Sequence, residues 1–427
     1  MIINNEFNLN RYINSNNIKL MNNLAHLPVF NSLKDNITTI TLKGRIGKGG
    51  YGTVYKCVDD NGNELAVKCI ENTNEGISCL METSIMSIIQ HPNINRALKI
   101  YSTFNKLYIV QELALCDLNQ WRHTHSPSSE QIKFLTHSLL QAVNCLHNNN
   151  IIHGDIKASN ILIYNNNTIK LSDFTLATRN NWPNNYLVCT CTHRPLEVWL
   201  DRKWNEKIDI WALGCTFFEL VYGFSLFPHQ DFDDSSDSIS TLSRKSIVRD
   251  KYINSLLYWG KYINHPYEFQ YRKASYKKFT LPPNFDPSSD INHLIISMLQ
   301  LNPLNRPSTS DLLVDPFYNS LPLIPCYIIS TPVITLGPRS EKKIKQLITE
   351  YSTDINVINL SYELYSRLTK LINIGDSTKI IGCIWISYKL IYRDFIDPTI
   401  LDITLSKIKE IERLICTFLS FQLHCSS

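Results

Sequence analysis

The sequence predicts an α+β fold in which a β-rich lobe and an α-rich lobe are followed by an all-α domain. Residues 39–115 form short alternating apolar runs separated by turn signals, a pattern typical of a twisted antiparallel sheet. Residues 126–318 show mainly the period of amphipathic helices. From about residue 338 onward only helical pattern remains. The order of these patterns also predicts a cleft where the first two lobes meet.

Composition excludes several classes of protein. A chain of 427 residues is too long for one compact core, so we expect two or three units. The 42 Lys and Arg against 38 Asp and Glu leave a net charge of +4, which does not favour nucleic acid or an anionic membrane as a partner. The twelve cysteines are scattered and are expected to be reduced thiols. Since no apolar run reaches about eighteen residues, we expect a soluble intracellular protein, in the cytoplasm or the nucleus.

The individual elements follow from local pattern. In the first lobe, residues 59–62 read DDNG and predict a hairpin turn, and residues 78–90 predict the single helix. In the second lobe the clearest helices are expected at 130–146 and 207–222. Residues 229–290 are only weakly patterned and join the later helices.

A glycine-rich run in the first lobe points to a nucleotide. Residues 47–54 read GKGGYGTV, and glycines let a backbone approach phosphates closely. A dinucleotide-binding fold would place a helix next, whereas residues 54–58 continue as a strand. On the following strand Lys68 is expected to contact phosphate, the alternative being a solvated lysine at a strand end. Glu82 is its expected carboxylate partner, the alternative being a surface glutamate.

The strongest chemical signal is a pair of short motifs in the second lobe. Residues 153–160 read HGDIKASN, and Asp173 follows thirteen positions after Asn160. Asp155 would orient an acceptor hydroxyl, Lys157 would neutralise charge on a transferring phosphoryl group, and Asn160 with Asp173 would hold magnesium. In the alternative interpretation, Asp155 and Asn160 only cap turns.

These motifs resemble those of eukaryotic-type protein kinases over residues 39–320. Residues 111–114 resemble the hinge that receives adenine, and residues 209–214 resemble the buried central helix of the large lobe. Glu197 and Arg306 match an ion pair that is structural and not catalytic. The resemblance implies a bilobal protein kinase fold that uses ATP and two Mg²⁺ ions.

The resemblance also assigns residues to the nucleotide and to the substrate class. Lys157 within the spacing D-x-K-x-x-N resembles serine/threonine kinases. Thr190 is expected to hydrogen-bond near Asp155 and Lys157, as the matching family residue does. The residues expected at the nucleotide are Ile46, Gly47, Lys48, Gly49, Gly50, Tyr51, Gly52, Thr53, Val54, Ala66, Lys68, Glu112 and Ala114.

The sequence departs from the family pattern in the regulatory positions. Gly154 stands where an arginine precedes the catalytic aspartate, Met81 and Thr178 replace two further arginines that clamp a phosphate, and Asn185 replaces the phosphorylated threonine. Because the phosphate and its partners are missing together, we expect a kinase that does not need phosphorylation of this loop. Thr175 replaces a glycine after the magnesium aspartate, which restricts the backbone there.

The tail resembles a cyclin box. Residues 377–392 are apolar around nearly the whole helix, as expected for a helix that others surround. Lys389 and Glu412 fall where cyclins carry the charged pair that grips the kinase helix, so we expect the tail to dock near Glu82, within the chain or between two copies. A generic helical extension is the alternative. The expected divisions are a polar extension at 1–38, a kinase domain at 39–320, a linker at 321–337 and a cyclin-box-like domain at 338–427.

Residues 75–82 resemble the cyclin-contacting helix of cyclin-dependent kinases, and residues 225–228 open a segment of the length that this group inserts. The sequence thus predicts a serine/threonine protein kinase that resembles the cyclin-dependent group and acts on protein hydroxyls. The rival interpretation is a pseudokinase or a cyclin-like interaction protein that binds or modulates another kinase. The activation segment is about three residues shorter than in cyclin-dependent kinases, which argues against a preference for proline after the acceptor.

Overall fold

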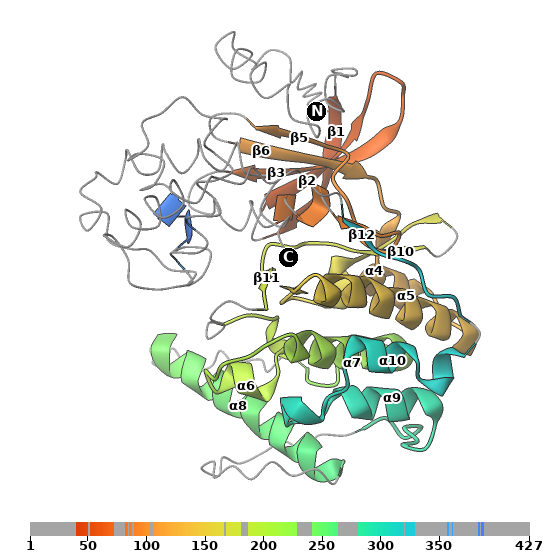
Figure 1. Cartoon of the computed structure of the whole chain (residues 1–427), viewed down its shortest axis with the longest axis vertical. Helices are drawn as coiled ribbons and strands as arrows, with labels where there is room; N and C mark the ends of the chain where they lie inside the picture. Colours follow the sequence, from red (N-terminus) through yellow and green to blue (C-terminus); the bar gives the residue numbers. More distant parts are fainter. Residues whose placement is uncertain are drawn as a thin grey trace, which may run out of the picture. The chain divides into compact units, whose positions relative to one another are not determined.

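The computed structural model divides the chain into two compact units (Figure 1). One unit comprises residues 1–90, 94–114 and 326–427, and the other comprises residues 91–93 and 115–325. The described residues are 40–49, 52–71, 82–83, 85–87, 89–102, 106–165, 168–180, 187–228, 241–263, 281–319, 321–328, 357, 361, 383, 384, 386 and 387.

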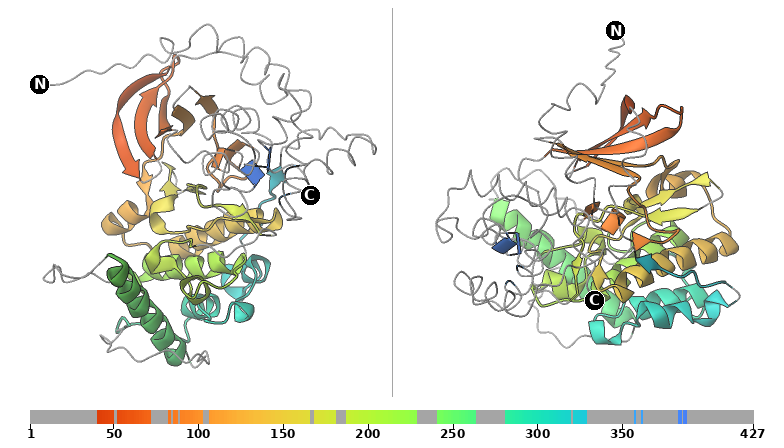
Figure 2. Two further views of the ribbon diagram at one scale, coloured as in Figure 1. Left: turned by 90° about the vertical axis from the view of Figure 1, so that its left-hand side faces the viewer. Right: turned by 45° about the horizontal axis from the view of Figure 1, so that its top comes forward.

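The first unit contains the predicted antiparallel sheet, with strand order β1-β2-β3-β6-β5. Its twist is visible in both views of Figure 2. The turn expected at residues 59–62 is present, because the Gly62 amide donates to the Asp59 carbonyl at 3.0 Å. The strands are β1 (Thr41–Gly49), β2 (Gly52–Val58), β3 (Glu64–Glu71), β5 (Lys99–Ser102) and β6 (Lys106–Glu112). The apolar core on this sheet comprises Ile40, Cys57, Val67, Cys69, Tyr108 and Val110.

The segment after Glu82 leaves its helix earlier than the sequence predicts. Residues 82–83 and 85–87 are helical, but the chain then forms strand β4 (Ile89–Gln90) where the predicted helix 78–90 would end. β4 pairs antiparallel with β12 (Tyr327–Ile328). Ile89 is buried and β-branched, which favours extended backbone once a partner strand is available. A distant part of the sequence therefore ends this helix.

The second unit is mainly helical, as predicted, and its two clearest helices lie close to the expected positions. α5 (Ser129–Asn148) begins with a capping box between Ser128 and Gln131, and α7 (Lys207–Tyr222) ends at Gly223 with a φ of 78°. The other helices are α4 (Leu118–Thr124), α6 (Leu196–Trp199), α8 (Thr241–Tyr262), α9 (Asp290–Met298) and α10 (Thr309–Leu313).

Helix α8 lies in the stretch that the sequence left weakly patterned. Ile253, Leu256 and Trp259 are buried, and the Trp259 indole donates to the Leu299 carbonyl at 2.8 Å. Much of the rest of the helix is polar, which dilutes the apolar period that a sequence window detects. Packing of this narrow stripe therefore stabilises a helix that the pattern alone does not reveal.

Short strands and single turns frame the loops that carry the predicted chemistry. β8 precedes the 153–160 loop, β9 follows it, and β10 precedes Asp173. The pairings are β10-β9-β7 and β11-β8. These elements are β7 (Cys116–Asp117), β8 (Ile151–Ile152), β9 (Ile161–Ile163), β10 (Ile169–Leu171) and β11 (Thr178–Arg179), with 3₁₀ turns η2 (Ala158–Asn160), η4 (Cys191–His193), η5 (Pro303–Asn305) and η6 (Pro316–Tyr318).

Two further expectations concern cysteines and membranes. Two described cysteines, Cys145 and Cys326, each take part in a disulfide, so the expectation that all cysteines are reduced thiols is wrong for these two in this structure. Seven other described cysteines are free. Within the described ranges, no helix combines the length and the apolar character that a membrane span requires.

The described tail residues are few. They are helical and buried, they belong to the first unit, and they comprise Val357, Ser361, Cys383, Ile384, Ile386 and Ser387. Lys389 and Glu412 lie outside the described residues. These positions alone do not support the predicted all-α, cyclin-like domain.

Candidate active site

The 153–160 loop is anchored to α7, a helix in which most residues are buried. Asp209, near the start of α7, accepts hydrogen bonds from the backbone amides of His153 at 2.8 Å and Gly154 at 2.9 Å. The ring of His147 on α5 lies 3.0 Å from the same carboxylate. Because Asp209 is fully buried, these contacts hold the backbone just before Asp155 in one position.

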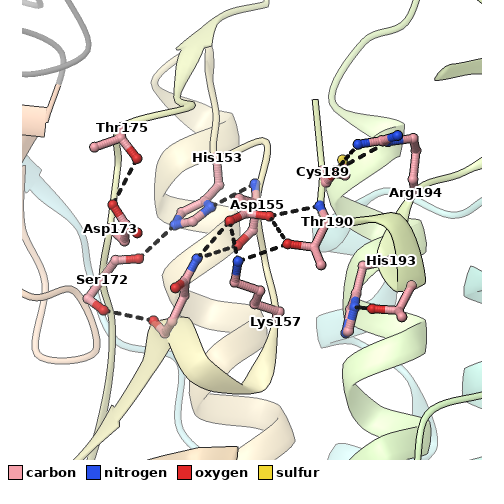
Figure 3. Close-up of polar contacts among 12 residues, drawn as sticks. His153, Asp155, Lys157, Ser172, Asp173, Thr175, Cys189, Thr190, His193 and Arg194 are labelled. Carbon is pink, nitrogen blue, oxygen red and sulfur yellow. Dashed lines mark hydrogen bonds and ion pairs between the residues drawn. The ribbon is translucent and has the colours of Figure 1, made fainter. Parts of the chain in front are cut away.

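Asp155 lies at the centre of a dense polar network (Figure 3). One carboxylate oxygen accepts from the Thr190 amide at 2.9 Å and the Thr190 hydroxyl at 2.7 Å. The other lies 2.8 Å from the Lys157 ammonium and 3.1 Å from the Asn160 amide nitrogen. Lys157 also donates to the Thr190 hydroxyl at 2.8 Å, as expected from the sequence. The carboxylate is therefore held in a single orientation, as a group that must position a substrate hydroxyl requires.

The same network determines the charge of Asp155. Burial by itself raises the pKa of this carboxyl, but the Lys157 charge and the hydrogen bonds from Lys157 and Thr190 outweigh it. The pKa of Asp155 is consequently below its ordinary value, and the carboxylate stays ionised to lower pH than a free aspartate does.

Replacement of Lys157 by Met should move the acid limb of the pH–activity profile upward by on the order of one pH unit. Without the ammonium the Asp155 carboxyl protonates at higher pH, so activity is lost sooner as the pH falls. kcat/KM measured against pH checks this, with exposed Lys203→Met as the control. Superimposable acid limbs for Lys157→Met and wild type would contradict it.

Asn160 and Asp173 are brought together by the strands on either side. Ser172 donates to the Asn160 carbonyl twice, through its amide and its hydroxyl, each at 2.9 Å. The Asn160 side-chain nitrogen donates to Asp155, which leaves the amide oxygen on the opposite side. An amide oxygen and a carboxylate are the oxygen ligands that Mg²⁺ accepts, usually completed by water and substrate phosphates. The residues present therefore fit a magnesium ion.

His153 packs inside the loop, between its backbone and Phe174. Its ring is fully buried and lies edge-on to Phe174, with 5.2 Å between the ring centroids. One ring nitrogen accepts from the Asp155 amide at 3.2 Å and the other contacts the Ser172 carbonyl at 3.1 Å. With both nitrogens bonded to backbone, the ring joins the two motifs that carry the candidate catalytic residues.

In the first unit the expected Lys68 and Glu82 pair is formed. The Lys68 ammonium lies 2.6 Å and 2.9 Å from the two carboxylate oxygens, and Glu82 is almost fully buried. Thr83, Ile85 and Met86 are buried beside it and hold this helical segment in place. A buried pair of this kind requires close partnering, so its formation argues against a solvated lysine and a surface glutamate.

The glycine-rich strands carry the other expected nucleotide contacts. Gly52 has a φ of 154°, and a Cβ at this position would lie 2.6 Å from the Cys69 carbonyl oxygen, so a side chain does not fit. Ile46 is 53 % exposed on β1. Gly50 and Tyr51 lie outside the described residues. The remaining expected contacts lie on β1, β2 and β3, at the end of β6 and just after it, and they are Gly47, Lys48, Gly49, Thr53, Val54, Ala66, Glu112 and Ala114.

The backbone conformation at residue 154 favours glycine, which the sequence did not reveal. Its φ is 76°, and an added Cβ would lie 2.9 Å from the Leu176 carbonyl oxygen. An arginine here would need the same strained backbone, whereas glycine adopts it without cost. Loss of the arginine therefore coincides with relief of strain beside Asp155.

We expect Gly154→Ala to reduce the free energy of unfolding by about 1–3 kcal/mol, because of the positive φ and the close carbonyl. Urea unfolding measures this. Gly44→Ala is the matched control, since a Cβ added at Gly44 would meet no atom within 4 Å. Equal midpoints for the two variants would show that the backbone at Gly154 relaxes freely.

A second cluster, next to Thr190, was missed at the sequence level. Cys189 has a φ of 62°, and its carbonyl accepts from the Arg194 guanidinium at 2.6 Å and 3.2 Å. Arg194 lies 4.4 Å from the ring centroid of Trp199, which in turn stacks on Tyr252. Neither the sign of a backbone angle nor this stack has a local sequence signal.

The expected pair of Glu197 and Arg306 is buried and bidentate. The two guanidinium nitrogens lie 2.6 Å and 2.9 Å from the two carboxylate oxygens. Arg306 also donates to the Gln300 carbonyl at 2.7 Å and lies 5.0 Å from the Trp211 ring centroid. All these contacts are structural and lie away from Asp155 in the sequence and in the hydrogen-bond network.

Comparison with known proteins agrees with this geometry. The family described as protein kinase domain matches residues 40–318. Extracellular signal-regulated kinase 1 of Candida albicans is 28 % identical over 302 residues, which cover 64 % of this chain and 71 % of the relative. Mitogen-activated protein kinase PMK1 of Pyricularia oryzae is 27 % identical over 289 residues, covering 64 % and 79 %. Mitogen-activated protein kinase 13 of Oryza sativa subsp. indica is 31 % identical over 301 residues, covering 65 % and 57 %.

These relatives are named as mitogen-activated or extracellular signal-regulated kinases, so they do not confirm the expected likeness to the cyclin-dependent group. The family match ends at residue 318 and does not reach the tail. Members of this family transfer the terminal phosphoryl group of ATP with the help of Mg²⁺. The chain belongs to the protein kinase family, as an enzyme of the serine/threonine type.

Proposed function

We propose that Asp155 orients the hydroxyl of a protein serine or threonine and takes up its proton late in the transfer. The observation that carries this is the orientation of its carboxylate by Lys157, Asn160 and Thr190. Lys157, beside it, neutralises charge that develops on the transferring phosphoryl group. Bound Mg²⁺ would supply further charge neutralisation, and Asn160 and Asp173 would hold it.

On the nucleotide side, Lys68 contacts the phosphates and Glu82 positions Lys68. The glycine-rich strands around residues 47–54 cover the phosphates, with Ile46, Val54 and Ala66 against the base. The backbone of Glu112 and Ala114 receives the adenine edge. The formed pair of Lys68 and Glu82 supports this assignment.

Transfer of labelled phosphate from ATP to a generic basic protein tests the proposal. Wild type should label serine and threonine, and Lys68→Met should leave only background, because the phosphates lose their cation. Equal background from both proteins would favour the rival function, a nucleotide-binding pseudokinase that modulates another kinase.

We also propose that substrates with proline after the acceptor are preferred. We place the residue that follows the acceptor beside Cys189 and Thr190, because Thr190 contacts the Asp155 carboxylate and Cys189 precedes it in the chain. The Cys189 carbonyl is already bonded to Arg194 and is not free to accept from a substrate amide. A residue without an N–H leaves no donor unsatisfied, whereas any other residue buries one.

Peptide pairs that differ only in proline or alanine after the acceptor check this, with kcat/KM expected to favour proline about tenfold. A third peptide with N-methylalanine separates loss of the N–H from the shape of the ring and should behave like the proline peptide. Equal use of alanine and proline peptides would contradict the proposal.

We also propose that the enzyme is active without phosphorylation of the activation loop, on the basis of residues around Asp155. Gly154 removes one of the cations that would receive a phosphate, and Thr178 is buried where another is expected. Thr190 is engaged with Asp155 and Lys157, which supports a structural role over that of a phosphate acceptor. A stoichiometric phosphate on residues 175–195 that raises activity would contradict this part of the proposal.

For the tail we propose the division made from the sequence, with a linker at 321–337 and a cyclin-like module at 338–427. Support comes from the pairing of β12 with β4, which brings the start of the tail next to the Glu82 segment. Tethering gives such a module an effective concentration of roughly millimolar, so Lys389 and Glu412 could act through a weak interface.

Deletion of residues 330–427 tests the tail while leaving β12 in place. We expect the truncated protein to fold and to lose most of its activity, which addition of the tail at high concentration restores in part. Unchanged activity of a folded truncated protein would favour a generic extension.

A further inference from the structure

We infer that Thr175 is a positioning residue that fixes the carboxylate of Asp173 for metal binding. This role rests on the proposed metal role of Asp173. The Thr175 hydroxyl donates to the Oδ1 atom of Asp173 at 2.8 Å (Figure 3). Thr175 is only 2 % exposed, so this hydrogen bond is shielded from water.

The backbone around this contact explains why a fixing group is useful. Asp173 has a φ of 64°, a backbone conformation that residues other than glycine rarely adopt. The next turn is closed by the Ala177 amide, which donates to the Phe174 carbonyl at 3.1 Å, and Phe174 is fully buried. The backbone after Asp173 is therefore fixed by this turn and by the buried Phe174. The Thr175 hydroxyl fixes the Asp173 carboxylate in addition.

A glycine at residue 175 would supply neither the hydroxyl nor the restriction of the backbone. A carboxylate oxygen has two lone pairs, so the bond from Thr175 takes up only one of those on Oδ1 and does not involve Oδ2. Hydrogen bonds from neighbouring groups to a metal-binding side chain orient it, and their loss typically weakens metal binding by about 10–100-fold.

Two observations separate the positioning role of Thr175 from simple space filling. Its hydroxyl donates directly to the carboxylate of Asp173, and the residue is buried beside the turn that follows Asp173. From the sequence alone, Thr175 was expected only to restrict the loop. The structure adds a specific atom, the hydroxyl oxygen. Replacing this hydroxyl by a methyl group, as in valine, keeps the shape of the side chain.

The test measures metal binding directly in the full chain. Mn²⁺ replaces Mg²⁺ as a probe that electron paramagnetic resonance detects, and a non-hydrolysable ATP analogue is present at saturation. Thr175→Val keeps the shape and removes the hydroxyl, and it should weaken Mn²⁺ binding by about tenfold. Thr175→Ser keeps the hydroxyl and should stay within about twofold of wild type.

Failure of the positioning role and failure of the metal role give different results. Wild-type Mn²⁺ affinity in Thr175→Val, with loss of affinity in Asp173→Asn, would overturn the role of Thr175 and leave the metal role intact. Equal weakening by Val and Ser would show that shape matters and would also overturn the role of the hydroxyl. Unchanged affinity in Asp173→Asn would refute the metal role itself. Thermal melting establishes that each variant is folded, and Thr175→Ala replaces Thr175→Val if that variant is not.

Discussion

Asp155→Asn should lower kcat by roughly 10²–10⁴-fold with little change in the KM for ATP. Asparagine has the size of aspartate but lacks its charge, so it neither accepts the hydroxyl proton nor balances the Lys157 ammonium. Its amide also places a donor where one oxygen now accepts from Thr190 or from Lys157. Single-turnover phosphate transfer measures the chemical step free of product release.

The matched control is Asp201→Asn. Asp201 is exposed, has a φ of 52° that asparagine tolerates well, and pairs at the surface with Arg249. This variant should keep wild-type activity. If Asp155→Asn retained more than about a tenth of wild-type kcat, the assignment of Asp155 as the orienting carboxylate would fail.

Arg306→Leu should lower the free energy of unfolding of its unit by about 3–5 kcal/mol. The substitution leaves the buried Glu197 carboxylate without its bidentate partner and opens the contacts to the Gln300 carbonyl and the Trp211 ring. Leucine fills part of the space, so the cost comes mainly from the unpaired charge. Urea unfolding followed by tryptophan fluorescence measures it.

Arg249→Leu provides the comparison, because its pair with Asp201 is exposed and such pairs contribute about 0–1 kcal/mol. A double variant, Glu197→Met with Arg306→Leu, should recover much of the loss, since no charge is then left unpaired. Similar stability of Arg306→Leu and Arg249→Leu would refute the structural role given to the buried pair.

The sequence predicted well which polar groups meet around Asp155, because several of them are close together in the chain. Asp155, Lys157 and Asn160 belong to one loop, and the structure brings their side chains into contact. Lys68 and Glu82 were also found, since a strand followed by a helix places them at a predictable separation. Such local constraints leave a readable pattern.

Features that depend on tertiary packing were not predictable in the same way. The positive φ of Cys189 coincides with the closing of Arg194 over its carbonyl, and the end of the Glu82 helix depends on a strand more than two hundred residues away in the chain. From the sequence, Gly154 was interpreted only as the loss of a positive charge. The structure shows in addition that the Leu176 carbonyl leaves no room for a side chain at this position. Each of these arises between segments that a sequence window never compares.

The pairing of β4 with β12 has a practical consequence for anyone who prepares this enzyme as a recombinant fragment. The family match ends at residue 318, and a fragment cut there would discard Tyr327 and Ile328. It would leave the backbone of Ile89 and Gln90 as an open strand edge, which invites association with other chains. A fragment that ends after residue 328 keeps this edge covered and is the better choice for crystallisation and for solubility.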